Sequence, residues 1–338
     1  MTEATVDRPA PAPRPDASQL EGLLETHRIE LTAYSYRILG SAFEAEDAVQ
    51  ETFIRAWRNY DRFEGRAKLR SWLYKIATNV CFDMKGASQR RARPIDLNPA
   101  LTADAPLGTP LAESTWIEPV PDERTVAAGG DPAAVAIARE SIRLAFVAAL
   151  QHLPPKQRAV LILREVLRWK AEEVAELLET SVPSVNSALQ RARATLAEKD
   201  LVEADPTPAI LDDEHQALLG RYVAAFEQYD MDALTSLLNE DARWSMPPYE
   251  IWLQTHRDIV AWCLGPGHAC RDSKLIPTMA NGSPAFAQYK PDPAGGWAPW
   301  SLQVLELEPD GSRIAGITFF LDTERFFPLF GLPDHLSA

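Results

Sequence analysis

Hydrogen-bonding side chains gather on one side of the segment 181–196. At helical spacing it carries Ser184, Ser187, Gln190 and Arg191, flanked by Asn186 and Arg193. Amide and guanidinium groups donate hydrogen bonds to base edges and phosphates, and small serine side chains let a helix approach a DNA groove closely. The chemistry indicated is therefore sequence recognition in DNA.

The opposite side of the same segment is apolar, so burying it would leave the polar face in solvent. Its buried stripe is expected to be Val185, Leu189, Ala192 and Leu196, and residues 171–178 form a shorter helix before it. Ser181 is the expected N-cap, with Pro183 in the first turn. By spacing alone, an ordinary amphipathic hairpin with a solvated polar face is equally compatible.

A second candidate surface lies on a helix predicted over 68–85. Opposite its apolar stripe, this helix would expose Ser71, Tyr74, Lys75, Thr78, Phe82 and Lys85. Aromatic rings stack on unpaired bases and cations pair with phosphates, so this face suits a single strand. The alternative is that these aromatic side chains pack on a neighbouring helix.

A third surface lies on a helix predicted over 44–60. Within a narrow arc it gathers Asp47, Gln50, Glu51, Ile54 and Arg58. An apolar side chain ringed by polar groups is typical of an anchor in a protein-binding surface. A solvated face with one stray isoleucine is the alternative.

Length and composition indicate two or three domains in 338 residues. No apolar run approaches membrane-spanning length and no secretory signal is recognisable, so we expect a cytoplasmic protein without a membrane partner. Cys81, Cys263 and Cys270 lack metal-ligand spacing, which predicts reduced buried thiols, no metal and no cofactor. The net charge of −14 argues against nonspecific wrapping of nucleic acid, although basic residues concentrate in 55–93 and 156–193.

Changes in composition divide the chain into six parts. These are a disordered tail (1–18), a helical module (19–92), an acidic Pro-rich linker (93–138), a second helical module (139–200), a joint (201–212) and a C-terminal domain (213–338). The C-terminal domain begins with helices and continues with β-rich runs. Asn281-Gly282 and Asp310-Gly311 separate such runs, which predicts hairpins.

Three motifs, in chain order, resemble region two and region four of the extracytoplasmic-function sigma factors of bacterial RNA polymerase. They are EDAVQETFIRAW, RSWLYKIATNVCFDM and LPPKQRAVLILREVLRWKAEEVAELLETSVPSVNSALQRAR. The resemblance implies two all-α sigma domains, a helical bundle and a helix-turn-helix. It favours the DNA-binding interpretation over the plain amphipathic hairpin.

The resemblance also implies partners, core RNA polymerase and promoter DNA, and a role for each surface. The clamp coiled coil would be bound by Asp47, Gln50, Glu51, Ile54 and Arg58, and the polymerase flap by region four. The minus-ten element would be opened by Arg62, Phe63 and Arg66 with Lys75, Thr78 and Asn79. The minus-thirty-five element would be read by Ser184, Asn186, Ser187, Gln190 and Arg191, with Arg168, Lys170 and Arg193 on phosphates. Family members usually carry Lys or Arg near the positions of Asn186 and Ala188, so phosphate affinity should be weaker here.

The linker between the helical modules is long for this family and cannot form a core of its own. Its acidic residues Asp96, Asp104, Glu113, Glu118, Asp122 and Glu123 would mimic nucleic acid in a basic channel of the polymerase. We hypothesise that Trp116 anchors the linker on the polymerase. A plain flexible tether is the alternative.

The C-terminal domain resembles the SnoaL-like cone-shaped α+β fold, which in a branch of the sigma family acts as an attached regulator. An aromatic pocket for a small-molecule ligand could involve Tyr222, Phe226, Trp244, Trp262, Tyr289, Trp300 and Phe319. Catalysis would need a proton-moving pair, for which Asp241, His256 and Asp322 are available without a spacing that selects two of them. Binding is therefore favoured over catalysis.

Two other classes of function compete with the sigma factor. A helix-turn-helix transcription regulator with a small-molecule-sensing domain leaves the helices of 44–91 unexplained and expects a dimer on a palindromic site. An isomerase-like enzyme with a DNA-binding module is the third class. Promoter-dependent transcription with core polymerase separates the three.

Overall fold

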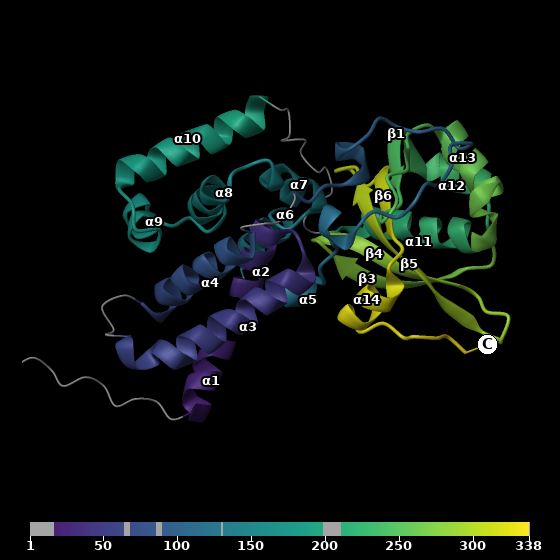
Figure 1. Ribbon diagram of the computed structural model, residues 1–338. Helices are drawn as coiled ribbons and strands as arrows, with labels where there is room; N and C mark the ends of the chain where they lie inside the picture. The colour runs from purple at the N-terminus through teal and green to yellow at the C-terminus, as the bar shows by residue number, and fades with distance from the viewer. Residues whose placement is uncertain (1–16, 64–67, 86–89, 130, 199–210, 338) are drawn as a thin grey trace, which may run out of the picture.

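The computed structural model describes residues 17–63, 68–85, 90–129, 131–198 and 211–337, and Figure 1 shows a helical half beside a half built on a β-sheet. The expected disordered tail lies outside the described residues except at its end, as does most of the predicted joint. Across the described ranges, no helix is both long and apolar enough to cross a membrane.

The first helical module consists of α1 (Ala17–Glu25), α2 (Arg28–Leu39), α3 (Ala42–Asn59), the 3-10 turn η1 (Tyr60–Arg62) and α4 (Leu69–Lys85). Gly40 ends α2 with a left-handed φ of 77°, as its position at the end of the apolar pattern predicts. Ser41 then caps α3 by accepting a hydrogen bond from the Glu44 amide at 3.1 Å. The tight corner brings α2 and α3 side by side.

The second helical module contains α6 (Pro132–Glu140), α7 (Leu144–Gln151), α8 (Pro155–Leu161), the π-helical turn η4 (Ile162–Val166), α9 (Ala171–Leu177) and α10 (Val182–Glu198). The buried stripe of α10 is the predicted one with Ala188 added. The Ser181 hydroxyl accepts a hydrogen bond from the Ser184 amide at 3.3 Å, so the predicted cap is confirmed.

The C-terminal domain combines α11 (Asp213–Glu227), α12 (Met231–Leu237), α13 (His256–Leu264), η5 (Pro266–Cys270) and α14 (Thr323–Leu329) with one sheet. Its strands are β1 (Leu238–Ser245), β2 (Trp252–Leu253), β3 (Lys274–Ala280), β4 (Ser283–Pro291), β5 (Trp297–Leu307) and β6 (Ile314–Phe320), in the order β2-β1-β6-β5-β4-β3. The two predicted hairpins are present as the antiparallel pairs β3–β4 and β5–β6, whereas β1 and β6 pair in parallel. Asn281 and Gly282 both have positive φ, as a two-residue hairpin turn requires.

Each face of this sheet contributes to a different core. One face packs against α11, α12 and α13 in a core that includes Trp244, Phe286 and Phe319. The other face joins α14, the linker and both helical modules in a second core, where Tyr289 and Phe327 lie with Tyr36. The C-terminal domain and the helical half therefore share a hydrophobic core. The fold class predicted from the sequence is confirmed, with a single open sheet in the C-terminal domain.

The linker packs along both halves through η2 (Pro94–Asp96), η3 (Glu113–Thr115) and the short helix α5 (Asp122–Thr125). Trp116, Ile117 and Val120 are at most 4% exposed. The linker has no core of its own, as expected, because its apolar side chains enter the shared core. An isolated bridge pairs Ala92 with Trp116, and another pairs Pro121 with Ala280.

Candidate nucleic-acid and polymerase interfaces

The outer side of α10 presents every side chain predicted to read base edges. Ser184, Asn186, Ser187, Gln190 and Arg191 are exposed. Arg191 donates a hydrogen bond to the Ser187 hydroxyl at 3.3 Å, so the two side chains lie on one face. Arg168 and Lys170 are exposed as well, and the exposed Arg193 pairs with Glu165. This surface is free to enter a groove.

The face of α4 predicted to hold a single strand is covered by the second helical module. Tyr74 and Thr78, both expected to be exposed, are 0% and 1% exposed. Trp169 packs on Tyr74 with ring centroids 5.1 Å apart, a separation typical of aromatic pairs. Lys75 forms an ion pair with Glu179 at 2.7 Å, whereas Asn79 is exposed. Thr78 is covered from within its own module, where it hydrogen-bonds the Tyr34 hydroxyl of α2 at 2.7 Å. The expectation of exposure was wrong because a sequence pattern within α4 does not reveal which other helices pack on it.

The loop predicted to help open DNA is only partly described. Phe63 is half-buried, with its ring centroid 5.0 Å from that of Trp72. Arg66 lies outside the described residues, and the side chain of Arg62 does too.

The predicted polymerase-binding arc on α3 faces solvent. Asp47, Gln50 and Arg58 are exposed and Ile54 is 38% exposed, while the half-buried Glu51 pairs with Arg55 at 2.7 Å. Trp57, three residues further along the same helix, is also exposed, at 40%. Ile54 and Trp57 line a groove of about 410 Å³ between α1 and α3. Their spacing of three residues on one helix was the signal that the sequence analysis missed.

Two buried arginines hold the helical modules against each other. Arg37 of α2 donates to the Ser141 hydroxyl at 2.7 Å, and Arg158 of α8 donates to the Ile38 carbonyl at the end of α2. Arg158 also donates to the carbonyls of Leu150 and Leu153. Burial lowers the pKa of Arg158 to about 10, which still leaves the guanidinium charged at neutral pH.

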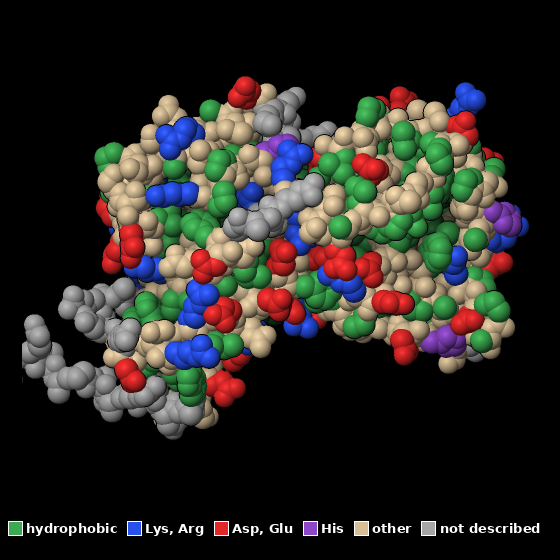
Figure 2. All heavy atoms as spheres, in the orientation of Figure 1, with side chains coloured by type: hydrophobic (Ala, Val, Ile, Leu, Met, Phe, Trp, Pro, Cys, Tyr) green, Lys and Arg blue, Asp and Glu red, His purple; other side chains and the backbone are tan. Residues whose placement is uncertain are grey.

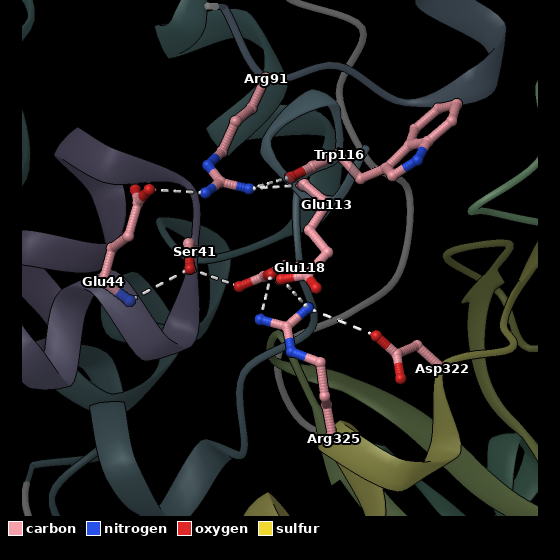
Figure 3. Close-up of polar contacts among 8 residues, drawn as sticks. All are labelled: Ser41, Glu44, Arg91, Glu113, Trp116, Glu118, Asp322 and Arg325. Atoms are coloured by element: carbon pink, nitrogen blue, oxygen red, sulfur yellow. Dashed lines mark hydrogen bonds and ion pairs between the residues drawn. The ribbon is translucent and has the colours of Figure 1, made fainter. Parts of the chain in front are cut away.

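Charged side chains of both signs gather where the helical half meets the sheet-containing half (Figure 2). Figure 3 shows the centre of this junction, where Glu118 of the linker lies between Ser41 and Arg325. Glu118 is 2% exposed; it accepts a hydrogen bond from the Ser41 hydroxyl and one from Arg325 at 3.0 Å. Its amide donates to the Gly40 carbonyl at 3.0 Å. One linker residue therefore joins the first helical module to α14.

The β3–β4 turn makes a second buried junction. Asn281, 0% exposed, donates to the Tyr36 hydroxyl at 2.6 Å and to the Ile142 carbonyl at 2.8 Å. It exchanges two hydrogen bonds of 3.0 Å with the backbone of Val120. A single turn of the C-terminal domain thus contacts both helical modules and the linker.

Trp116, the predicted polymerase anchor, is 4% exposed. It lies beside Pro247, Pro248 and Phe326, and its carbonyl accepts a hydrogen bond from Arg91 at 2.7 Å. In this arrangement the indole is not available to a partner.

The C-terminal domain encloses a cavity of about 460 Å³. Of the aromatic side chains predicted to line it, Phe226, Trp244, Trp262, Trp300 and Phe319 do so. Tyr222 and Tyr289 do not, because Tyr222 hydrogen-bonds Gln303 inside the domain and Tyr289 packs on Phe327 at the other sheet face. Lining residues that the sequence pattern did not indicate are Tyr229, Tyr249, Cys263, Cys270 and the linker residues Ala105, Pro106 and Leu107.

The three candidate proton-moving groups do not meet in this cavity. Asp241 is exposed, His256 contacts the Asn239 carbonyl at 2.7 Å, and Asp322 lies near Arg325 in the junction. None of them is among the residues that line the cavity.

A helical module with an outward docking face, followed by a helix-turn-helix whose polar face is free, defines a promoter-recognition subunit. Residues 23–91 match the Sigma-70 region 2 family and residues 143–196 match Sigma-70 region 4. The first match accounts for the helices that a free-standing helix-turn-helix regulator leaves unexplained.

Similar proteins of known family identify the subunit more closely. The ECF RNA polymerase sigma factor SigG of Mycobacterium tuberculosis is 46% identical over 319 residues, covering 92% of this chain and 83% of SigG. SigJ of the same organism is 31% identical over 233 residues, covering 68% and 64%. The crystal structure of SigJ shares the fold, at a TM-score of 0.57 and 21% identity over 94% of this chain and all of that one. The chain belongs to the ECF RNA polymerase sigma factors and directs promoter-specific transcription initiation.

Proposed function

We propose that this sigma factor rests in a closed form, in which its own C-terminal domain and linker hold the two helical modules together. The observation that carries the proposal is the packing of Trp169, from the second helical module, on the buried Tyr74 of α4, with ring centroids 5.1 Å apart. A face that must receive the minus-ten strand cannot do so while Trp169 covers it. Initiation then requires α4 and the second helical module to separate.

The surfaces have separate roles in this scheme. The α3 groove at Ile54 and Trp57 binds the clamp coiled coil of core RNA polymerase, and the second helical module contacts the flap. Gln190 and its neighbours on α10 read the minus-thirty-five element. Loop 61–66, Lys75, Thr78 and Asn79 act on the minus-ten element after opening, and Trp116 reaches the polymerase only when the linker leaves its site. The protein acts in the cytoplasm, where it meets core RNA polymerase and promoter DNA.

The closed form is supported by contacts of different strength. The exposed Lys75–Glu179 ion pair contributes little, since water screens surface charges and the two side chains lose freedom when they pair. The buried hydrogen bonds of Arg158 and Asn281 contribute more, because a buried polar group left without a partner costs about 1–3 kcal/mol. Core polymerase opens the chain only to the extent that it binds the open form more tightly than the closed one.

We further propose that the C-terminal domain regulates without catalysing. The cavity is lined by uncharged side chains, and the carboxylates and histidine suggested by the sequence lie elsewhere. General acid–base chemistry needs such a group within hydrogen-bond reach of the substrate.

Run-off transcription with limiting core polymerase tests the closed form. Asn281→Gly keeps the left-handed turn accessible and removes the contacts with Tyr36 and Ile142, so transcript should rise about fivefold or more. Asp310→Ala changes the other hairpin turn, which does not contact the helical modules, and should leave transcript unchanged. Equal output from wild type and Asn281→Gly would contradict the proposal.

A further inference from the structure

The cavity of the C-terminal domain has walls suited to flat rings. Trp244 and Phe319 lie side by side with ring centroids 4.5 Å apart, and Trp262 and Tyr249 face the same space. Its volume of about 460 Å³ falls within the range of small-molecule sites and holds a compound of two or three rings. Aromatic walls of this kind stabilise a ring-containing ligand by offset stacking as well as by apolar burial.

The cavity wall disfavours a charged ligand. Among the residues that line it there is no Asp, Glu, Lys, Arg or His. Gln288 already uses its amide on Ser273, Ser301 and Gln303, and burial raises the pKa of the Cys263 thiol to about 12, which keeps it neutral. Two cations lie outside the lining against its aromatic rings: the Lys290 ammonium, 3.1 Å from the centre of the Trp300 ring, and the Arg271 guanidinium, 5.2 Å from the centre of the Tyr229 ring. A charged ligand would lose its water without gaining a counter-charge inside the cavity.

One wall of the cavity comes from the sigma linker. Ala105, Pro106 and Leu107 line it, although they lie more than one hundred positions before the domain in sequence. The segment is attached on either side by backbone hydrogen bonds of 2.9 Å, from Leu101 to the Trp252 carbonyl and from Leu111 to the Pro248 carbonyl. Leu107 itself is 39% exposed, so this wall is thin and lies at the mouth.

We propose that this cavity is a binding site for an uncharged aromatic small molecule, and that linker residues 105–107 form its lid. A ligand stacked between Trp244 and Trp262 contacts the underside of the lid and holds it in place. The same linker continues into the buried residues Trp116 and Glu118, so an occupied cavity stabilises the closed form. This last step rests on the proposed function, whereas the site and its lid do not.

Binding is tested on the full chain with a matched pair of fluorescent probes. N-phenyl-1-naphthylamine is uncharged, and 1-anilinonaphthalene-8-sulfonate has the same ring system with one sulfonate. The neutral probe should bind saturably, one per chain, and at least tenfold more tightly than the sulfonate. Binding without saturation, or equal affinity for the two probes through Lys290, would overturn the assignment.

Variants locate the site and the lid. Met246→Trp fills the cavity and should weaken binding of the neutral probe at least tenfold, while Leu264→Trp, exposed on α13 outside the cavity, should not. If Met246→Trp fails to fold by circular dichroism, Ala269→Trp at the exposed rim replaces it. Hydrogen exchange of the amides of Leu101 and Leu111 should slow at least threefold when the neutral probe is bound. If the neutral probe binds saturably but the exchange rates of these two amides do not change, linker residues 105–107 are not a lid. That result would not contradict the proposed closed form, which the transcription experiment with Asn281→Gly tests separately.

Discussion

Lys75 of α4 and Glu179 of the second helical module form an ion pair, with 2.7 Å between Nζ and Oε1. The lysine predicted to contact promoter DNA is therefore engaged by a carboxylate of the module that covers α4. A phosphate and Glu179 would compete for the same ammonium group.

Glu179→Gln removes this competition at little cost to stability. Glu179 is exposed and its ion pair is screened by water, so we expect the free energy of unfolding to stay close to that of the wild type. Urea unfolding of the full chain measures it. A clear loss of stability would mean that this pair, and not the buried contacts, holds the modules together.

Arg158→Met should be far more damaging. The substitution removes the guanidinium donor from the buried carbonyls of Ile38 and Leu153, which costs about 3 kcal/mol or more, while the Leu150 carbonyl keeps the Leu153 amide as its donor. Arg193→Met removes an arginine whose side chain is 63% exposed and is the matched control, with an expected loss below about 1 kcal/mol. Similar losses for the two variants in urea unfolding would refute this ranking.

Ile54→Ala should weaken binding to core polymerase. An apolar anchor in a docking groove contributes about 1–2 kcal/mol or more, equivalent to roughly fivefold to thirtyfold in Kd. Leu264→Ala removes a leucine that is 55% exposed in the C-terminal domain and should leave the affinity unchanged. Titration of labelled chain with core enzyme gives both values, and an unaltered Kd for Ile54→Ala would exclude the groove.

Gln190→Ala and Arg193→Ala, both on α10, should separate base reading from phosphate binding. Loss of a base contact costs about 1–3 kcal/mol at one promoter position, whereas loss of a phosphate contact also lowers the salt slope by about one. The holoenzyme–promoter Kd at several salt concentrations, with the exposed Gln216→Ala as control, distinguishes them. Wild-type affinity in both variants would remove α10 from the promoter interface.

Asp122 gives the junction a predictable pH dependence. Burial raises the pKa of Asp122, against the lowering effects of the Gly282 amide and of Arg139 and Arg143. A folded-state pKa above the unfolded value means that the protonated form favours folding. The stability it contributes is present at low pH and is lost as pH rises through the folded-state pKa.

Asp122→Asn should therefore gain stability relative to wild type as pH rises above the ordinary aspartate value of about 3.9. Denaturant unfolding of both chains from pH 4 to pH 8 gives the difference. A relative gain on acidification instead would show that the ionised carboxylate, paired with Arg139, is the favoured form.

The sequence by itself determined the elements and the faces that they can offer. Helical periodicity fixed the buried stripe of α10 and left Gln190 exposed, and the polar ring around Ile54 marked a surface that faces solvent. Asn281-Gly282 specified a hairpin turn, since both residues tolerate positive φ. These features depend on neighbours within a few residues, which a local pattern contains.

Only the tertiary structure decided which of those faces are covered. The pattern of α4 predicts that Tyr74 and Thr78 are exposed, yet Trp169 packs on Tyr74 and Tyr34 of α2 hydrogen-bonds Thr78. Trp116 was predicted to anchor another protein, yet it packs beside Pro247. The cavity likewise takes one wall from Leu107 of the linker. Such contacts join segments about one hundred residues apart, and their energy comes from burial in a shared core, which no local spacing encodes.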